Sequence, residues 1–283
     1  MTAVPFIKWV GGKGRLLGQL EPLLPTRVTT WVEPFLGGGG TLFGLGLGRA
    51  ETCFGADINY PLVNAFRAVR DRLDDLIAEL EGMRRLGHYS TVYYQLREEF
   101  NSTPQSMLSH GPHADVRLAA LFIYLNKTGF NGLYRVNQQG ELNVSCGNYT
   151  EPRIFDADEM RAASAALQGV GLACVPWQRM LAKCTPDDFV YLDPPYVPVT
   201  SDFKYSQDGF TAEDHEALAM ALRELSDCGA RFMLSQSDTP GARDIYRDNR
   251  GWNTTVLTVS RSISSKASTR GDVTELVVRN YTQ

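Results

Sequence analysis

Short apolar runs that suit buried β-strands recur along the chain, and stretches with helical spacing separate several of them. The runs lie at 29–35, 51–57, 172–176, 189–192, 231–235, 254–260 and 273–280. After residue 156 they alternate with helical stretches at 211–225 and 241–248, which predicts a mostly parallel sheet covered by helices. The last run alternates apolar and polar residues, so we expect it to close the sheet as an antiparallel edge strand.

Helical spacing dominates the middle of the chain. Apolar residues recur every three or four positions through 61–80, and 88–100 and 114–125 have a similar pattern. Two short runs beyond them, 133–136 and 142–145, flank a turn and predict a β-hairpin. We therefore expect an α/β protein in which a mainly helical lobe that carries this hairpin is inserted into a sheet domain. The expected parts are 1–60 for the first part of the sheet domain, 61–155 for the lobe and 156–283 for the second part.

Composition indicates a chain that can bury a large core. It has 283 residues, of which 43% are hydrophobic, and no apolar run approaches membrane-spanning length. The first residues lack the pattern of a secretion signal, so we expect a cytoplasmic protein with no membrane partner. We also expect it to be a monomer. The five cysteines include no Cys-x-x-Cys pair, and the four histidines have no metal-ligand spacing. We expect no disulfide framework, no metal and histidines at the surface.

The net charge of the whole chain says little about a nucleic-acid partner, but one stretch of the chain is basic. The net charge of −4 argues mildly against a nucleic-acid ligand, which favours a basic protein surface. Between Arg243 and Arg270, however, six basic residues stand against two acidic ones. This stretch would suit a phosphate backbone, and a solvated surface with unpaired arginines is the open alternative.

A glycine-rich segment follows the first strand-like run and predicts a nucleoside-binding loop. Gly37 to Gly40 predict a tight turn, a helix is expected from residue 41, and the next run ends in Asp57. An acid about 20 residues beyond such a loop can bind ribose hydroxyls. Leu42 stands where a dinucleotide fingerprint requires its third glycine, so the loop favours S-adenosylmethionine over a dinucleotide.

A glycine pair near the N-terminus offers a second place for an anionic ligand. Lys8, Trp9 and Lys13 surround Gly11 and Gly12, so backbone amides and cations can approach a carboxylate closely. The glycine spacing and the Lys-Ser or Lys-Thr pair of a Walker loop are missing. Alone, this segment is a weak signal.

The segment Asp193-Pro194-Pro195-Tyr196 follows a run that suits a central strand, and it carries the predicted chemistry. The prolines must end the strand, which leaves Asp193 at its end with little backbone freedom. The Asp193 carboxylate and the Pro194 carbonyl are acceptors that match the two N–H donors of an exocyclic amine such as adenine N6. Accepting both hydrogens favours a pyramidal nitrogen whose lone pair can attack a methyl carbon. Tyr196 offers a face on which a flipped-out base can stack, and a turn that merely ends a strand is the alternative.

The predicted hairpin and the polar segment that leads into it suggest contact with DNA. Arg135 has the fork-shaped donor that bridges O6 and N7 of a guanine, and Phe130 has a ring that can wedge between bases. A purely structural hairpin is the open alternative.

Six motifs follow one another along nearly the whole chain. They are Lys8-Trp9-Val10-Gly11-Gly12-Lys13, Val32-Glu33-Pro34-Phe35-Leu36-Gly37-Gly38-Gly39, Ala56-Asp57-Ile58-Asn59, Asn131-Gly132-Leu133-Tyr134-Arg135, Asp193-Pro194-Pro195-Tyr196 and Arg261-Ser262-Ile263-Ser264-Ser265. In this order the chain resembles the Dam-type DNA adenine-N6 methyltransferases with the alpha arrangement of motifs. The resemblance implies a Rossmann-like methyltransferase sheet with an inserted target-recognition lobe. It also implies methyl transfer from S-adenosylmethionine to a flipped-out adenine in a GATC-like site of double-stranded DNA.

Carried over position by position, the resemblance implies three sets of site residues. The catalytic set is Asp193, Pro194, Pro195 and Tyr196. The set expected to bind S-adenosylmethionine is Trp9, Lys13, Glu33, Pro34, Phe35, Gly37, Gly39, Asp57 and Asp193. The set expected to contact DNA is Lys8, Phe130, Asn131, Leu133, Arg135, Arg261 and Ser262.

Two positions depart from the family's bacterial pattern. Phe130 stands where that pattern has tyrosine, and Ser145 where it has proline, which leaves the outer bases of the site less defined. Phe130 keeps the ring needed to wedge but lacks the hydroxyl donor. The resemblance places the neighbouring Asn131 beside the space that a flipped adenine leaves.

Three other functions fit part of the pattern. An amino-methyltransferase for cytosine N4 or a glutamine amide also needs two acceptors, but those relatives usually have serine or asparagine where this chain has Asp193. A nicotinamide-dependent oxidoreductase would share the glycine loop, but its glycine spacing is missing. A catalytically silent DNA-binding relative conflicts with an intact Asp193 and Tyr196.

Overall fold

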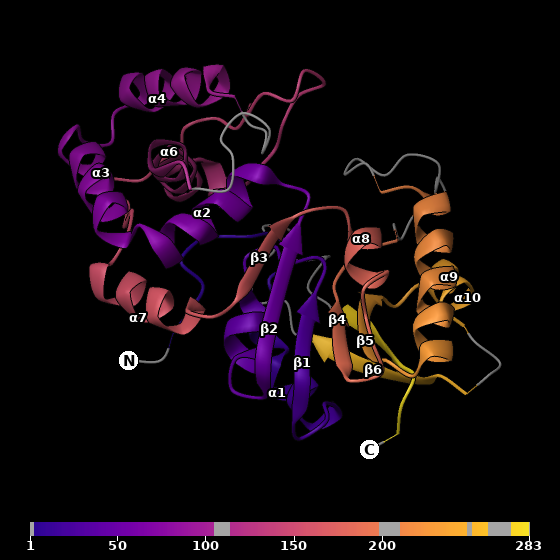
Figure 1. Ribbon diagram of the computed structural model, residues 1–283. Helices are drawn as coiled ribbons and strands as arrows, with labels where there is room; N and C mark the ends of the chain where they lie inside the picture. The colour runs from indigo at the N-terminus through magenta and orange to yellow at the C-terminus, as the bar shows by residue number, and fades with distance from the viewer. Residues whose placement is uncertain (1–2, 105–113, 198–209, 248–250, 260–272, 283) are drawn as a thin grey trace. The chain divides into compact units, whose positions relative to one another are not determined.

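A seven-stranded β-sheet carries the fold in the computed structural model, which describes residues 3–104, 114–197, 210–247, 251–259 and 273–282. Its strands are β1 (Val28–Glu33), β2 (Ala50–Asp57), β3 (Gly171–Cys174), β4 (Asp188–Leu192), β5 (Arg231–Ser237), β6 (Asn253–Val259) and β7 (Val273–Arg279). Their order is β3-β2-β1-β4-β5-β7-β6 (Figure 1). β1 pairs with β4, and β4 with β5, in parallel, whereas β7 is antiparallel to both β5 and β6. This is the mostly parallel α/β architecture that the apolar runs predict.

The position of β7 differs from the predicted edge strand. Its Leu276 pairs with Gln236 of β5 on one side and with Val256 of β6 on the other. Leu276, Val277 and Val278 are all buried, while Val256 is 42% exposed. Because β7 pairs with a strand on each side, it lies inside the sheet and β6 forms the edge.

The predicted helices are present with different boundaries, and the described residues also contain helices at Leu17–Leu20, Ala157–Leu167 and Trp177–Leu181, where none was predicted. They are α1 (Leu17–Leu20), α2 (Tyr60–Asp71), α3 (Leu73–Arg85), α4 (Ser90–Ser102), α6 (Val116–Thr128), α7 (Ala157–Leu167), α8 (Trp177–Leu181), α9 (Ala212–Cys228) and α10 (Pro240–Ile245). The pattern in 61–80 predicts one helix, but Arg72, with φ −137° and ψ 39°, separates α2 from α3. After the glycine loop, a short π-helix, η3 (Leu42–Gly46), replaces the expected α-helix.

Capping side chains explain where three helices begin. The Asn59 side chain accepts the N–H of the third residue of α2, and Asp115 does the same for α6. Thr211 and Asp214 form a reciprocal capping box at the start of α9. The same helix ends at Gly229, whose φ of 91° is open to glycine at little cost.

The chain divides into two compact units, each assembled from separate segments. The first comprises Met1–Gly12, Leu36–Gly44 and Gly55–Val175, and the second comprises Lys13–Phe35, Leu45–Phe54 and Pro176–Gln283. The three-part division predicted above stays a prediction. In the described residues, no helix is long and apolar enough to cross a membrane.

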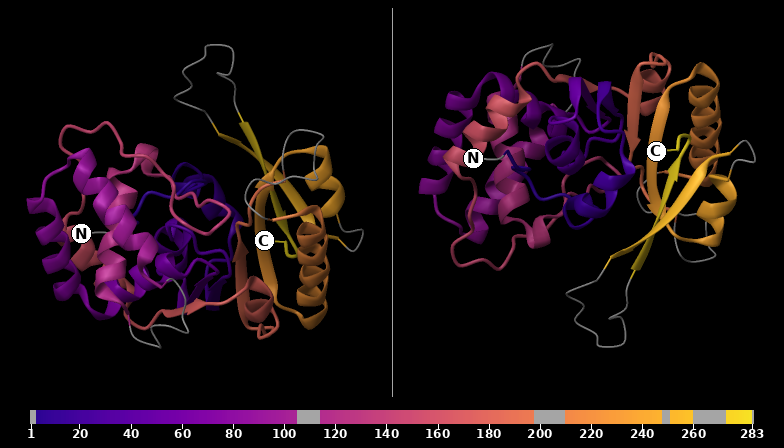
Figure 2. Two further views of the ribbon diagram at one scale, coloured as in Figure 1. Left: turned by 90° about the horizontal axis from the view of Figure 1, so that it is seen from above. Right: turned by 90° about the horizontal axis from the view of Figure 1, so that it is seen from below.

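The first unit is built around α6. This helix is buried from Leu118 to Asn126 and contacts α2, α3 and α4. Figure 2 shows these purple and magenta helices gathered together. Because α6 is apolar on nearly all sides, its C-terminal end provides a rigid support for the segment that follows it.

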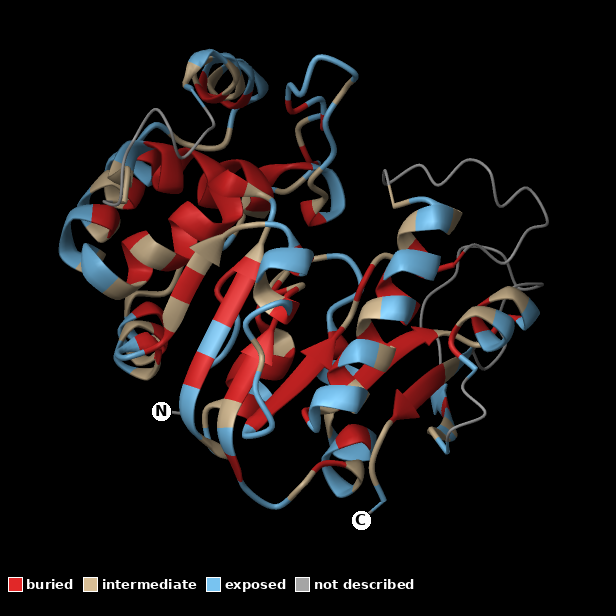
Figure 3. Ribbon diagram, turned by 45° about the vertical axis from the view of Figure 1, so that its right-hand side comes forward, coloured by how far each residue is buried: buried red, intermediate tan, exposed pale blue. Residues whose placement is uncertain are grey.

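In the sheet of the second unit, β4 and β5 are buried on both faces. On one face α8, α9 and α10 pack on Val190, Leu192, Phe232 and Leu234 of β4 and β5. Figure 3 shows these strands as buried, while α9 exposes one side to solvent. Trp31 of β1 stacks on Tyr191, with ring centroids 5.9 Å apart. This packing holds the carboxyl ends of β1 and β4 at one edge of the sheet.

The prediction of surface histidines is wrong for His215. This residue is 1% exposed, and its Nδ1 lies 2.7 Å from the hydroxyl of Tyr246. It precedes Leu218 and Leu222 on the inner stripe of α9, so helical periodicity places it in the core. Burial lowers the pKa of His215 to about 4, so the ring is neutral at pH 7.

Candidate functional site

The carboxyl end of β4 presents Asp193, as the sequence predicts. Every residue of β4 is buried, and the strand stops at the two prolines. The exit from the turn is fixed to β5, because Val197 N–H donates to Gln236 Oε1 at 2.8 Å and Ser237 Oγ donates to the Val197 carbonyl at 2.7 Å. The backbone on both sides of Asp193 is therefore held before any ligand binds.

Lys13 binds Asp193 across 180 residues of sequence. The Lys13 Nζ donates to Asp193 Oδ2 at 2.7 Å and lies 4.9 Å from the centroid of the Tyr196 ring. The Lys13 side chain is 4% exposed and that of Asp193 20% exposed. An ion pair so well removed from water orients both groups, because breaking it leaves a charge uncompensated.

Glu275 of β7 completes this cluster, and sequence reasoning missed it. Tyr196 donates its hydroxyl hydrogen to Glu275 Oε2 at 2.8 Å. The strand register places Glu275 opposite Ser237 at the end of β5. The only signal in the sequence was a single acid in the otherwise apolar and hydroxyl-bearing run 273–278.

Burial sets the protonation of this second-unit cluster of Lys13, Asp193, Tyr196 and Glu275. It raises the pKa of Asp193, while the Lys13 ammonium and the Tyr196 hydroxyl oppose that rise. It also raises the pKa of Glu275, again against the attraction of Lys13. Burial and the two carboxylates together raise the pKa of Tyr196, so its hydroxyl remains a hydrogen-bond donor at neutral pH. Two carboxylates share one ammonium, an arrangement that favours a cationic ligand.

Glu33, Pro34 and Phe35 follow β1 in the same unit. Glu33 is 1% exposed and accepts the Trp31 indole N–H at 3.1 Å. Phe35 packs edge-on against Phe210, with ring centroids 6.0 Å apart. These contacts hold the segment that precedes the glycine loop.

The glycine loop and Asp57 lie together in the first unit. Asp57 accepts the Gly37 N–H at 3.1 Å through Oδ2 and the Asn59 N–H at 2.9 Å through Oδ1. Gly37 and Gly39 have φ values of 47° and 72°, which glycine adopts readily. Burial raises the pKa of Asp57, and the backbone donors oppose the rise. The predicted glycine loop is thus hydrogen-bonded to Asp57, the acid predicted to lie beside it.

Trp9 lies directly on this loop. A Cβ atom at Gly37 or Gly38 would come within 2.9 Å or 2.8 Å of Trp9 atoms, so only glycine permits this approach. Trp9 stacks in turn on Tyr134, with ring centroids 5.9 Å apart and an angle of 24°. The Tyr134 hydroxyl hydrogen-bonds to the side chain of Asn59 next to Asp57. Sequence reasoning assigned no role to Tyr134, although it lies inside one of the six motifs.

Residues 130–146, which we call the recognition arm, contain most of the predicted DNA contacts. The arm begins with the 3-10 turn η4 (Phe130–Gly132), in which Asn131 has φ 54°. Among the described residues Asn131 is the only one other than glycine with a positive φ, a strain that is typical of functional positions. Phe130 is 51% exposed, as a wedge would require, and Leu133 is half-buried.

The arm pairs as predicted but does not form regular strands. Asn143 N–H donates to the Arg135 carbonyl at 3.0 Å, and Val136 forms an isolated bridge with Leu142. Side chains of α4 bind the backbone of the arm instead. Asn101 binds both the N–H and the carbonyl of Leu142, and Arg97 donates to the Val144 carbonyl at 2.9 Å. A strand ladder is therefore replaced by side chains of α4.

Arg135 is exposed near the middle of this arm. Its Nε donates to Asn143 Oδ1 at 2.8 Å, and its Nη2 donates to the Asn143 carbonyl at 3.3 Å. Asn143 thus orients the guanidinium. Arg261 and Ser262 lie outside the described residues, as does much of the basic stretch; within it, Arg243 pairs with Asp238 at 2.6 Å.

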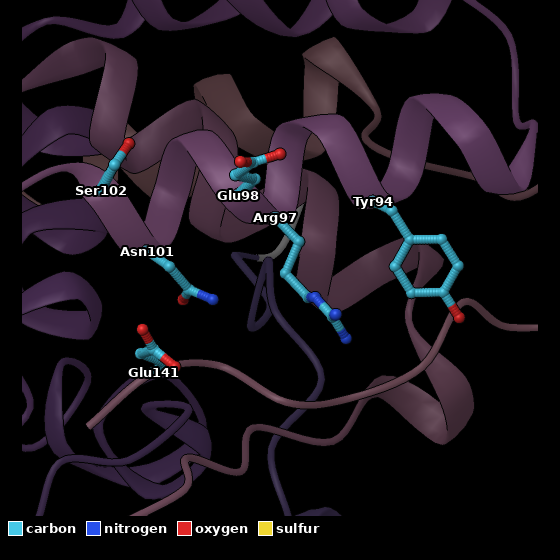
Figure 4. Close-up of a pocket in the computed structure, with 6 residues that line it drawn as sticks. All are labelled: Tyr94, Arg97, Glu98, Asn101, Ser102 and Glu141. Atoms are coloured by element: carbon cyan, nitrogen blue, oxygen red, sulfur yellow. The ribbon is translucent and has the colours of Figure 1, made fainter. Parts of the chain in front are cut away.

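A polar cavity of about 460 Å³ lies beside α4 and the arm. Figure 4 shows the residues that line it, which are Tyr94, Arg97, Glu98, Asn101, Ser102 and Glu141. It contains none of the residues predicted from sequence to act on a substrate or cofactor. Within the described ranges, no group of three or more His, Cys, Asp and Glu residues is arranged to hold a metal ion.

Comparison with known proteins identifies relatives along nearly the whole chain. A family model described as "D12 class N6 adenine-specific DNA methyltransferase" matches residues 9–263. The Type II methyltransferase M.MjaIII of Methanocaldococcus jannaschii is 35% identical, over 99% of this chain and 100% of the relative. The Type II methyltransferase M1.LlaDCHI of Lactococcus lactis is 33% identical, over 98% and 95% of the two chains. The DNA adenine methylase of Escherichia coli K12 is 34% identical, over 96% and 93%.

Proposed function

Since the chain belongs to the D12 class N6 adenine-specific DNA methyltransferases, we propose that it methylates N6 of an adenine flipped out of duplex DNA at a GATC-like site. The family fixes the enzyme class, the adenine N6 target and DNA as the substrate. The proposal adds the methyl donor, the flipping of the base and the sequence of the site.

The position of Asp193 is the observation that carries the proposal. It stands at the end of a buried strand with its carboxylate oriented by Lys13 at 2.7 Å. We propose that the second carboxylate oxygen and the Pro194 carbonyl accept the two N–H hydrogens of the target amine. Tyr196, held by Glu275, presents its ring to the base. A paired adenine cannot reach such a turn, which is why the base must leave the stack.

The residues also suit S-adenosylmethionine. Asp57 offers a carboxylate for a ribose diol, the glycine loop offers backbone N–H groups, and Trp9 covers the space that side chains at Gly37 and Gly38 would fill. The cofactor, when bound, supplies the activated methyl group. We propose that Trp9, Lys13, Asp57 and Asp193 bind it, together with the segment from Glu33 to Gly39.

We propose that Lys8, Leu133 and Arg135 read the bases of the site, that Phe130 wedges into the stack and that Asn131 lies beside the vacated position. Arg261 and Ser262 are proposed to contact the DNA backbone. Exposure of Phe130 and Arg135 on the recognition arm supports this assignment. We further propose that the protein acts as a monomer.

A random-sequence duplex library tests the proposal. The library is incubated with the protein and S-adenosylmethionine, and methylated adenines are mapped by methyl-sensitive sequencing. We expect N6-methyladenine within GATC or a single-base relative of it, and none with Asp193→Ala. An Arg135→Ala variant should lose about 1–3 kcal/mol of discrimination at one base pair. Methylation without a preferred sequence would refute the proposed site, and methylation by Asp193→Ala would refute the proposed chemistry.

A further inference from the structure

One buried side chain, Asn126, connects two segments that we propose to read DNA. Its Oδ1 accepts the Lys8 backbone N–H at 2.8 Å, and its Nδ2 donates to the Lys8 carbonyl at 2.8 Å. The same Nδ2 donates to the Gly132 carbonyl at 3.0 Å. Asn126 is 3% exposed, so these bonds are shielded from competing water. The amide thus replaces the pair of hydrogen bonds that a neighbouring β-strand would make to Lys8.

The Lys8 side chain is guided by the same surroundings. A Cβ atom at Gly132 would collide with the Lys8 methylene groups, so the side chain lies directly on the backbone of the recognition arm. Its Nζ lies 3.4 Å from the Lys127 carbonyl and 4.8 Å from the centroid of the Tyr149 ring. Lys8 itself remains exposed. Its charged end therefore reaches solvent from a fixed position beside Gly132.

We propose that Asn126 is a positioning residue for sequence specificity, which holds Lys8 in register with the recognition arm. This inference rests on the proposed function. Lys8 and the arm are far apart in sequence, yet a base contact requires donor and acceptor within about 2.7–3.2 Å. Asn126 fixes the main chain of Lys8 to Gly132, which stands between Asn131 and Leu133. Without that link, Lys8 can shift against the arm and lose its base while both segments stay folded.

The test compares Asn126→Ala with a matched control, Asn64→Ala. Asn64 is 1% exposed and makes the same pair of hydrogen bonds to a backbone. Its Oδ1 accepts the Asp115 N–H at 2.8 Å and its Nδ2 donates to the Asp115 carbonyl at 2.8 Å. Asn64 lies in the same unit, and its two hydrogen bonds go to Asp115 and not to Lys8 or the recognition arm. Both variants lose a buried pair of hydrogen bonds from a side-chain amide to a backbone, but only Asn126→Ala removes the pair that holds Lys8.

The measurement is the rate of N6 methylation on the preferred site and on each of its single-base-pair variants. We expect Asn126→Ala to lose about tenfold of discrimination at one base pair, the same one at which Lys8→Ala loses it. Discrimination at the pair affected by Arg135→Ala should be kept. A variant that carries both Asn126→Ala and Lys8→Ala should lose no more discrimination at this base pair than Lys8→Ala alone. Asn64→Ala should slow all substrates by the same factor.

Two results would overturn the inference. One is unchanged discrimination, or a uniform fall like that of Asn64→Ala. The other is a double variant whose loss equals the product of the two single losses. If Asn126→Ala does not fold, Gly132→Ala provides the second test, since its methyl group displaces the Lys8 side chain, and unchanged discrimination at that base pair would equally overturn it. A wild-type protein that methylates no adenine would instead contradict the proposed function.

Discussion

Replacing Lys13 with methionine removes an ammonium group from the partly buried carboxylate of Asp193 while keeping most of the side-chain volume. Lys13 Nζ lies 2.7 Å from Asp193 Oδ2, and the Lys13 side chain is only 4% exposed. For charges about 4 Å apart at an effective dielectric constant of about 20, the interaction is about 4 kcal/mol. One pKa unit corresponds to about 1.4 kcal/mol, and measured shifts from one opposite charge are about 1–3 units. We therefore expect the pKa of Asp193 to rise further when the ammonium group is removed.

The direction of the effect on activity follows from the proposed role of Asp193 as a hydrogen-bond acceptor. The ionised carboxylate is a much stronger acceptor than the protonated carboxyl group, so activity is lost as the pH falls through the pKa of Asp193. Burial already raises that pKa, and Lys13 opposes the rise. In Lys13→Met the loss must therefore begin at higher pH. The acidic limb of the kcat profile should therefore lie at higher pH than in the wild type.

The assay is methyl transfer at saturating S-adenosylmethionine and DNA, from pH 5 to 9. Saturation is needed because Lys13 is also proposed to bind the cofactor, which would affect KM. Lys13→Arg keeps the positive charge and serves as the control, with its acidic limb close to that of the wild type. A Lys13→Met profile that is lower at every pH but has an unshifted limb would refute the electrostatic reasoning.

Three further predictions concern other parts of the structure. Asp57→Ala should weaken S-adenosylmethionine binding by about 1–3 kcal/mol, and calorimetry that finds unaltered affinity would contradict the placement of Asp57. Glu275→Ala should lower kcat about tenfold or more with little change in cofactor affinity, because Tyr196 loses a hydrogen bond to a charged group worth about 1.5–3 kcal/mol. Glu275→Gln keeps an acceptor and should restore most of the rate; equal loss in both variants would count against this role. Burial lowers the pKa of His215 to about 4, so unfolded chains bind its proton first as the pH falls below the usual value. The contribution of His215 to the free energy of unfolding is complete above about pH 6.5 and should fall by about 3 kcal/mol toward pH 4, as measured by denaturant titrations. His215→Gln should remove this pH dependence.

The sequence predicted those parts of the site that depend on local patterns. A strand that ends in two prolines placed Asp193, and a glycine loop followed by a second strand placed Asp57. Both predictions needed only neighbouring residues. The chemical types of these side chains then limited what the site can bind.

The remaining parts depend on contacts between distant residues, which periodicity does not reveal. Glu275 binds Tyr196 from a strand 79 residues later, and Asn126 binds Lys8 across 118 residues. The place of β7 inside the sheet likewise depends on pairing with both β5 and β6. The break at Arg72 is local, but apolar spacing continues across it, so periodicity alone predicts one helix. Regular strands in the recognition arm were predicted wrongly because side chains of α4 compete for the backbone groups.

The parallel pairing of β1 with β4 has a consequence for the newly made chain. The register joins Thr30 to Asp188. A ribosome adding about 5–20 residues per second needs roughly 8–30 s to make the intervening stretch. Throughout that time Trp31 and Val32, both buried in the finished protein, have no β4 to cover them. We therefore expect the nascent N-terminal third to depend on chaperones during translation, and a circular permutant that makes β4 before β1 to depend on them less.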